Sequence, residues 1–245
     1  MVTERWDWDR GCLLENQQKL HGPFMKNLLR LITSKYAGVP EQVELRQQYE
    51  RCCRESSDIH EHMPVLRALA NECNSVIEIG LRTMTSTWGI LQGLQENPSS
   101  VCSYLGVDLV QPPEDILDLA RRLAEANGIS FRFWQANDMD IELEPADMLF
   151  IDSKHTYCHL TYELETFSSK IQKYIAMHDT DEPWGYIDDF QVYHGDKSEY
   201  PASIDRNRVG LWAAVEDFLK RHPEWVLQER RLNNHGFTIL KRISV

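Results

Sequence analysis

The sequence predicts an α/β fold in which helices cover both faces of a mostly parallel sheet. Short, almost continuous apolar runs alternate with helical segments, which is the pattern of parallel strands buried on both sides. The predicted strands are residues 75–80, 104–108, 130–135, 147–152 and 173–179, and the helices between them are 86–95, 114–126 and 157–171. Two more strands, 225–231 and 236–242, flank the turn-rich Asn233-Asn234-His235-Gly236 and predict an antiparallel C-terminal hairpin.

The segment before the sheet predicts an N-terminal helical extension, residues 1–72, followed by the main domain, residues 73–245. Helical spacing of apolar residues runs from about residue 13 to residue 70, and Gly38, Pro40 and Pro64 interrupt it. This spacing is seen in Phe24, Leu28, Leu29, Leu31 and Ile32. Residues 181–209 fit neither helix nor strand, and a loop of this length in a compact domain predicts a functional, substrate-side segment.

Composition and charge indicate the class of protein and exclude some classes of partner. The chain has 245 residues, 42% hydrophobic and 26% charged, which is typical of a globular protein. Its net charge is −12, and most of the excess acid lies in residues 73–245, which disfavours nucleic acid and anionic membranes as partners. The charged first ten residues and the absence of an apolar run of about 20 residues predict a cytoplasmic protein. The six cysteines lack CxxC spacing, so we expect reduced thiols.

A ligand site is predicted where the first strand ends. The strand closes in Glu78-Ile79-Gly80, and a helix begins near Ser86 and Thr87. A glycine there allows close backbone approach, and the helix N-terminus offers unpaired N–H groups to an anion. About thirty residues later the second strand ends in Asp108, the place of an acid that binds ribose hydroxyls. Together these features predict an adenosine-containing ligand.

The stretch from Glu78 to Trp88 resembles the E-x-G-x-R-x-x-x-S-T-W form of the first motif of class I, Rossmann-like methyltransferases. LGVDL, QAND, FIDSKHTY and YIAMHDT follow in matching order, so the resemblance covers about residues 57–242. It implies a three-layer Rossmann-like sheet and S-adenosylmethionine as the cofactor. The residues that it implies for cofactor binding are Glu78, Gly80, Arg82, Ser86, Thr87, Asp108, Asn137 and Asp138.

In that resemblance Glu78 to Arg82 wrap the methionine half of the cofactor, Asp108 binds the ribose, and Asn137 or Asp138 meets the adenine amine. The turn departs from the family pattern because Arg82 and Thr83 stand where glycines often occur. Arg82 could pair with the cofactor's carboxylate. The same departure keeps open a second hypothesis, a binding protein that retains the methyltransferase fold without activity.

A reaction site is predicted at the ends of the fourth and fifth strands, because ligands bind at the carboxyl edge of such sheets. Asp152 closes the fourth strand, His155 follows it, and His178-Asp179 close the fifth. Two carboxylates can hold a divalent cation such as Mg²⁺, which lowers the pKa of a bound hydroxyl. His155, with an ordinary pKa of about 6.5, could then take the proton.

This D-x-x-H arrangement is similar to that of metal-dependent O-methyltransferases acting on small molecules and macrolide sugars, and of the cephalosporin hydroxylase group. The resemblance implies Asp152 and Asp179 as metal ligands and His155, with Asp152, in catalysis. His178 stands where the group usually has a second acidic ligand, and it completes the predicted metal set. Asp152 could instead cap the next helix, and either histidine could be an ordinary interior residue. His159, His194 and His222 follow no pattern and are expected at the surface.

The acceptor is suggested by the aromatic and acidic residues of segment 181–209. Aromatic faces stack on sugars or cations, and carboxylates bind hydroxyls or amines, although a solvated loop is an equal alternative.

The leading hypothesis is an S-adenosylmethionine-dependent O-methyltransferase for a small or saccharide-like acceptor, assisted by Mg²⁺ or another divalent metal. A metal-dependent oxygenase on the same fold is a further alternative, since two histidines and a carboxylate suit non-haem iron. Homo-oligomerisation is left open.

Overall fold

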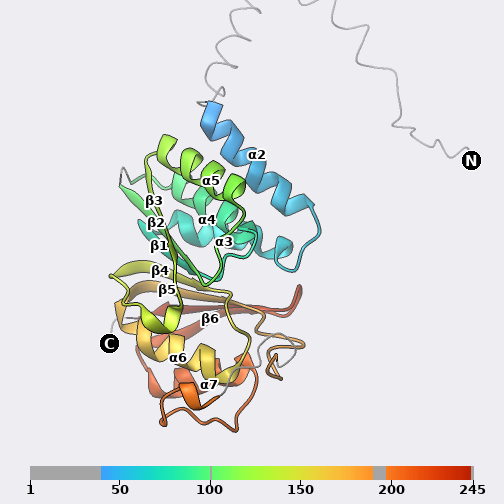
Figure 1. The fold of residues 1–245 in the computed structure, drawn as a ribbon, viewed down its shortest axis with the longest axis vertical. Coiled ribbons are helices and arrows are strands. Elements are labelled where there is room, and N and C mark those ends of the chain that lie inside the picture. The colour runs from blue at the N-terminus through green and yellow to red at the C-terminus, as the bar shows by residue number, and fades with distance from the viewer. Residues whose placement is uncertain (1–39, 100, 190–196, 244–245) are drawn as a thin grey trace, which may run out of the picture.

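A seven-stranded sheet forms the centre of the protein in a computed structural model that describes residues 40–99, 101–189 and 197–243 (Figure 1). The strands are β1 (Ser75–Ile79), β2 (Cys102–Asp108), β3 (Ile129–Gln135), β4 (Ala146–Ile151), β5 (Ile171–His178), β6 (Trp225–Arg231) and β7 (Phe237–Arg242). Their order is β3-β2-β1-β4-β5-β7-β6. Strand β7 runs antiparallel to both β5 and β6, and the other pairs are parallel. The predicted sheet with its C-terminal hairpin is confirmed.

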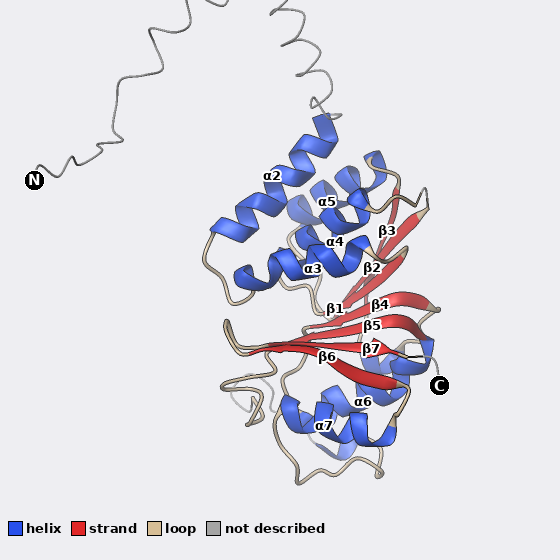
Figure 2. Ribbon diagram, turned by 180° about the vertical axis from the view of Figure 1, so that it is seen from behind, coloured by secondary structure: helices blue, strands red, loops and turns tan. Residues whose placement is uncertain are grey.

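Helices cover both faces of the sheet, which gives three layers (Figures 1 and 2). One face carries α2 (Pro40–Arg54), α3 (Met63–Asn71), α4 (Thr85–Glu96) and α5 (Glu114–Ala126), and the other carries α6 (Tyr157–Phe167) and α7 (Leu211–Arg221). Side chains of a strand alternate between the faces, so Val76 joins the core that contains Trp88, and Ile77 joins the core that contains Phe167. Because both faces are covered, most residues of the central strands are apolar.

Two elements differ from the prediction. The helix expected over 157–171 ends at Phe167 and continues as a 3₁₀ turn, Ser168–Lys170, before β5 begins. Helix α7 was not predicted, although its buried residues Leu211, Ala214, Val215 and Phe218 follow helical spacing. It begins after Gly210, whose N–H donates to the Asp188 carboxylate at 2.9 Å.

The prolines expected to interrupt the N-terminal helices stand where helices begin. Pro40 is the first residue of α2, and Pro64 lies in the first turn of α3, where the missing N–H costs nothing. Both helices pack on α4, and Leu45 and Met63 belong to the same core as the sheet. The apolar residues that suggested a helix between Phe24 and Ile32 lie outside the described residues. The domain boundary at residue 72 stays a prediction.

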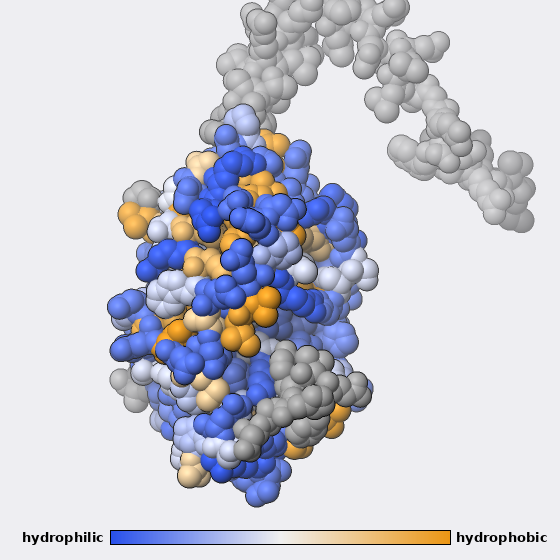
Figure 3. All heavy atoms as spheres, viewed as in Figure 1, coloured by the Kyte–Doolittle hydropathy of each residue, from blue (hydrophilic) through white to orange (hydrophobic). Residues whose placement is uncertain are grey.

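The surface is polar over most of the face shown in Figure 3, with apolar side chains scattered among charged ones. No helix within residues 40–99, 101–189 and 197–243 is long and apolar enough to cross a bilayer.

The turn between β6 and β7 holds the segment that precedes α3. Asn234 and His235 have positive φ angles of 48° and 66°, the backbone geometry of a tight hairpin turn. The Asn234 side chain accepts a hydrogen bond from the Glu61 N–H (3.1 Å) and donates one to the Ser57 carbonyl (3.0 Å). His62 Nε2 lies 3.0 Å from the Asn233 carbonyl oxygen. Residues 57–62 are thereby fixed beside the carboxyl edge of the sheet.

Candidate active site

A cavity of about 850 Å³ opens at the carboxyl ends of β1, β2 and β4 and at the residues after β3. This is the edge where open α/β sheets bind ligands. Its wall includes Gly80, Arg82, Ser86, Asp108, Asn137, Asp138, Asp152 and His155, together with Ile59 from the segment before α3. The volume is within the range of small-molecule and cofactor sites.

The backbone conformation of the turn after β1 requires a glycine at position 80. Gly80 has φ 88°, and a Cβ there would lie 2.0 Å from the backbone oxygen of Asp152. Arg82 (φ 45°) and Met84 (φ 63°) also have positive φ, which is uncommon for residues with side chains. The turn is clamped by Asp108, because its carboxylate accepts the N–H groups of Leu81 (2.7 Å) and Arg82 (3.0 Å). Asp108 therefore stabilises a turn that has few glycines, and it still borders the cavity.

Glu78 lies beneath the cavity and not in its wall. It is fully buried, and its carboxylate accepts hydrogen bonds from the hydroxyls of Ser86, Thr87 (2.8 Å) and Tyr104. Burial raises the pKa of Glu78 to about 7, and the three hydroxyl donors oppose part of that rise. Glu78 and Thr87 thus join the start of α4 to β2, whereas Ser86 alone of the three predicted residues also reaches the cavity.

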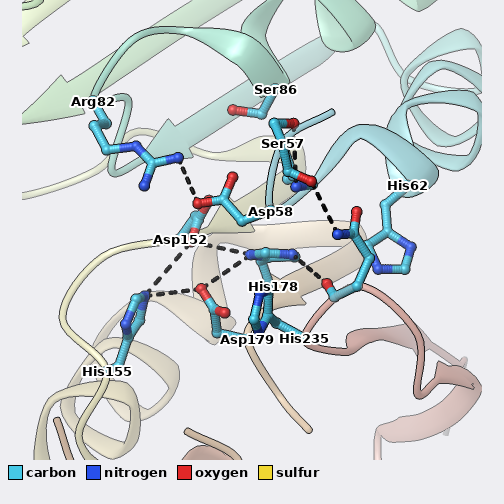
Figure 4. Close-up of polar contacts among 12 residues, drawn as sticks. Ser57, Asp58, His62, Arg82, Ser86, Asp152, His155, His178, Asp179 and His235 are labelled. Atoms are coloured by element: carbon cyan, nitrogen blue, oxygen red, sulfur yellow. Dashed lines mark hydrogen bonds and ion pairs between the residues drawn. The ribbon is translucent and has the colours of Figure 1, made fainter. Parts of the chain in front are cut away.

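Arg82 forms an ion pair with a residue from the other side of the cavity mouth. Its Nη2 lies 2.6 Å from Asp58 Oδ2, and Figure 4 shows the two side chains pointing toward one another. The Arg82 side chain is 70% exposed, so it can turn to another anion at small cost. Arg82 is the predicted partner of the cofactor's carboxylate, and in this structure it pairs with Asp58 instead.

Four ionisable side chains from β4 and β5 form the predicted acid–histidine cluster, made of Asp152, His155, His178 and Asp179 (Figure 4). His155 Nε2 lies 3.0 Å from Asp179 Oδ2 and 3.7 Å from Asp152 Oδ1. His178 Nδ1 lies 3.0 Å from Asp179 Oδ2, and its Nε2 lies 3.1 Å from the Asn234 carbonyl oxygen. The structure therefore brings together all four residues predicted from the strand ends.

Charge pairing controls protonation in this acid–histidine cluster. Burial alone would lower the pKa of His155, but hydrogen bonds and charge from Asp152 and Asp179 outweigh it and raise the pKa to about 9. The same balance raises the pKa of His178 well above its ordinary value. Despite burial, the histidines lower the pKa of both carboxyl groups. The mutual attraction of these groups therefore favours the protonated form of both histidines and the ionised form of both carboxyl groups.

The donor atoms that could hold a cation here differ from the predicted set. Oxygen or nitrogen atoms of Asp152, His155 and Asp179 lie within 4.8 Å of one another. His178 fits less well as a ligand, because Nε2 donates to the Asn234 carbonyl and Nδ1 faces Asp179. The alternative role of Asp152 as a helix cap is filled by Thr156, whose side chain accepts the His159 N–H at 3.3 Å. Asp152 therefore does not cap α6, and its Oδ1 faces His155 and His178.

The described part of segment 181–209 brings an aromatic side chain to the acid–histidine cluster. Trp184 stacks on the His155 ring with centroids 6.0 Å apart and an interplanar angle of 23°. Asp189 is buried, and its Oδ2 lies 4.0 Å from His155 Nδ1. Phe190, Tyr193 and His194 lie outside the described residues.

A second buried cluster, made of Asp138, His159 and Glu163, was missed by the sequence reasoning. His159 was expected at the surface but is 5% exposed, and its Nε2 lies 2.8 Å from Asp138 Oδ2. Glu163 is fully buried one helical turn further along α6. The i,i+4 spacing of His159 and Glu163 was the available signal, since it places both on one face of the helix. Asn137 lies next to this cluster in the cavity wall, and its side chain accepts the Met139 N–H at 3.2 Å.

Comparison with known proteins supports the fold assignment. No family model and no curated protein matches the sequence. A candidate O-methyltransferase from Klebsiella pneumoniae is 14% identical with a TM-score of 0.51, and the match covers 88% of this chain and 95% of that chain. A protein from Corynebacterium glutamicum is 15% identical with a TM-score of 0.52, covering 89% and 98%. Cofactor-bound Rv0187 from MTB is 13% identical with a TM-score of 0.50, covering 90% and 97%. At identities this low, the structural matches establish a shared architecture alone. The chain has the Rossmann-like fold of class I methyltransferases.

Proposed function

We propose that this protein is an S-adenosylmethionine-dependent O-methyltransferase acting on a small acceptor. The observation that carries the proposal is one continuous cavity that connects the turn after β1, the acid at the end of β2 and the acid–histidine cluster at the end of β4. A cofactor that carries both an amino acid and a nucleoside needs such a series of polar groups along one sheet edge. The similarity to a candidate O-methyltransferase agrees with it.

The cofactor is assigned to the wall formed by β1, β2 and the residues after β3. Gly80 and the turn that follows would receive the methionine half, with Arg82 exchanging Asp58 for the cofactor's carboxylate. Asp108 keeps acceptor capacity beyond its backbone partners and would bind the ribose. Asn137 or Asp138 would meet the adenine amine. Bound there, S-adenosylmethionine supplies an electrophilic methyl group close to Asp152 and His155.

The acceptor's proton is assigned to His155. Its Nε2 faces Asp152 and Asp179, which hold the ring in place and stabilise the imidazolium. With a pKa of about 9 the ring is protonated at neutral pH, so it acts as a base only in the fraction of molecules that has lost this proton. We therefore expect turnover in the absence of added cation to increase with pH up to about pH 9.

A divalent cation is assigned to the carboxylates of Asp152 and Asp179. Each carboxylate offers oxygen, the ligand that Mg²⁺ prefers, and an oxygen of each lies within 4.8 Å of the other. A cation there would polarise an acceptor hydroxyl and would offset the negative charge that keeps His155 protonated.

The acceptor class that we propose is a saccharide-like or polyhydroxylated small molecule. Trp184 presents an aromatic ring beside His155, and aromatic rings stack on sugar faces. Asp189 adds a buried carboxylate on the same side, which can accept hydroxyl hydrogen bonds.

Calorimetric titration with S-adenosylmethionine and S-adenosylhomocysteine tests the cofactor assignment. Asp108→Asn should weaken binding of both, whereas Asp115→Asn, an exposed acid in the first turn of α5, should leave it unchanged. Absence of binding by the wild-type chain would refute the assignment. Transfer of labelled methyl to a panel of saccharides and phenols, with Mg²⁺ or with a chelator, then tests the acceptor and the cation. Binding without transfer to any acceptor would favour the inactive binding protein.

A further inference from the structure

The buried cluster of Asp138, His159 and Glu163 has the composition of a metal site. It supplies one imidazole nitrogen and two carboxylates, and an atom from each lies within 4.8 Å of the others. His159 and Glu163 come from one face of α6, and Asp138 comes from the 3₁₀ turn Asp138–Asp140 after β3. The ligands therefore stand on two separate elements, the 3₁₀ turn and α6.

Outer hydrogen bonds orient two of these side chains. His159 Nδ1 lies 3.1 Å from the Tyr200 hydroxyl, which fixes the ring so that Nε2 faces Asp138. Ser153 Oγ donates to Glu163 Oε1 at 2.7 Å, which fixes the carboxylate plane. Metal-ligating histidines and carboxylates are usually held by outer partners in this way.

One carboxylate oxygen of Glu163 is buried without a hydrogen-bond donor among the described residues. The side chain is fully buried, and the oxygen without a donor is Oε2. A fully buried carboxylate oxygen without a donor is costly, and a bound cation would satisfy it.

We propose that Asp138, His159 and Glu163 bind a first-row transition-metal dication of the Zn²⁺ type. The imidazole nitrogen favours such an ion over Mg²⁺ or Ca²⁺, which prefer oxygen ligands alone. His159 Nε2 now lies 2.8 Å from Asp138 Oδ2 and 3.9 Å from Glu163 Oε1. Ligands about 2.1 Å from one tetrahedral ion lie roughly 3.4 Å apart, so each distance would change by about half an ångström. Small side-chain rotations suffice for that change.

The ion would reach the site through the main cavity, because Asp138 and His159 border it. Once bound, the ion would fix Asp138 beside the position proposed for adenine. It would be separate from the cation proposed at Asp152 and Asp179, which belong to the ends of other strands.

Zinc titration of the full-length, chelator-treated chain tests this proposal without cofactor or acceptor, so its outcome is independent of methyl transfer. The titration is done in the Asp179→Asn background, which removes one of the three ligand atoms that the acid–histidine cluster offers to a cation. We expect one Zn²⁺ per chain. Glu163→Gln should weaken that binding by more than the roughly 10- to 100-fold typical of losing an outer partner, and Tyr200→Phe should fall within that range.

The matched control is Glu165→Gln, on the same helix but pairing with Arg221 at the surface, and it should bind Zn²⁺ as the parent does. Circular dichroism and urea unfolding check that each variant folds. If Glu163→Gln does not fold, His159→Gln replaces it, and a Co²⁺ complex then reports the loss of a nitrogen ligand in its visible spectrum. Failure of the Asp179→Asn chain to bind Zn²⁺ at micromolar concentrations overturns the proposal. Equal affinity of the folded Glu163→Gln or His159→Gln chain also overturns it.

Discussion

Glu78→Gln should change how the stability of the protein depends on pH. Glu78 is buried with a pKa of about 7, whereas the ordinary value is 4.5. A carboxyl group whose pKa is raised on folding binds more protons in the folded state than in the unfolded state between these two values. Its contribution to stability is therefore complete below pH 4.5 and is lost as the pH rises to about 7.

The size of the loss follows from the two pKa values. Their difference, 7 minus 4.5, is about 2.5, and at about 1.4 kcal/mol for each tenfold change in affinity the full loss is about 3.5 kcal/mol. Glutamine keeps the shape of the side chain and cannot ionise. Its amide oxygen can replace Oε2 as the acceptor for Thr87, and its NH2 group can donate to the Ser86 hydroxyl, so at low pH the variant should lose only about 1 kcal/mol.

Urea unfolding of both proteins at half-unit steps from pH 5 to pH 8 measures the difference. Histidines elsewhere titrate in both proteins and cancel when one free energy of unfolding is subtracted from the other. We expect wild type to lose about 2 to 3 kcal/mol relative to Glu78→Gln across this interval. A difference that stays constant with pH, or that moves in favour of wild type as the pH rises, would refute the reasoning.

Three further predictions concern the cavity wall. His155→Ala should lower kcat about 10²- to 10⁴-fold in an assay of methyl transfer, with unchanged calorimetric affinity for S-adenosylhomocysteine, and an unchanged rate would remove His155 from the mechanism. Gly80→Ala should destabilise the chain to urea by more than about 2 kcal/mol, because the φ angle is 88° and the new Cβ meets the backbone of Asp152; a change under about 0.5 kcal/mol would contradict the close approach. Arg82→Ala should cost less than about 1 kcal/mol by the same measurement, because its pair with Asp58 is exposed, and a larger loss would show that this pair holds residues 57–62 in place.

The strands could be predicted because each is marked by an apolar run within its own sequence. Burial of both faces requires an apolar run, and β2, β4 and β5 show one almost from end to end. Helix α7 carried an equally clear apolar spacing, but it follows a polar and aromatic segment in which the sequence predicts neither helix nor strand. Without the contact between Asp188 and Gly210 there was no local sign of where that segment ended.

The candidate site was predictable where position along a strand determines it. Asp152 and Asp179 follow neighbouring parallel strands, so they had to meet at one edge of the sheet. The orientation of Glu78 was not predictable, because a motif gives its place in the strand but not the hydroxyls that surround it. The pairing of Arg82 with Asp58 joins segments 24 residues apart through a fold that neither segment specifies alone.

The link between residues 57–62 and the β6–β7 turn has a consequence for the order of folding. Its hydrogen bonds join residues 171 to 177 positions apart, so one wall of the cavity depends on contacts between segments far apart in the sequence. Closing so large a loop carries an entropic penalty and slows folding. During synthesis on the ribosome, the sheet edge that holds Gly80 and Asp108 is complete long before the hairpin emerges. Ligand affinity should therefore appear late, after the β6–β7 turn has docked.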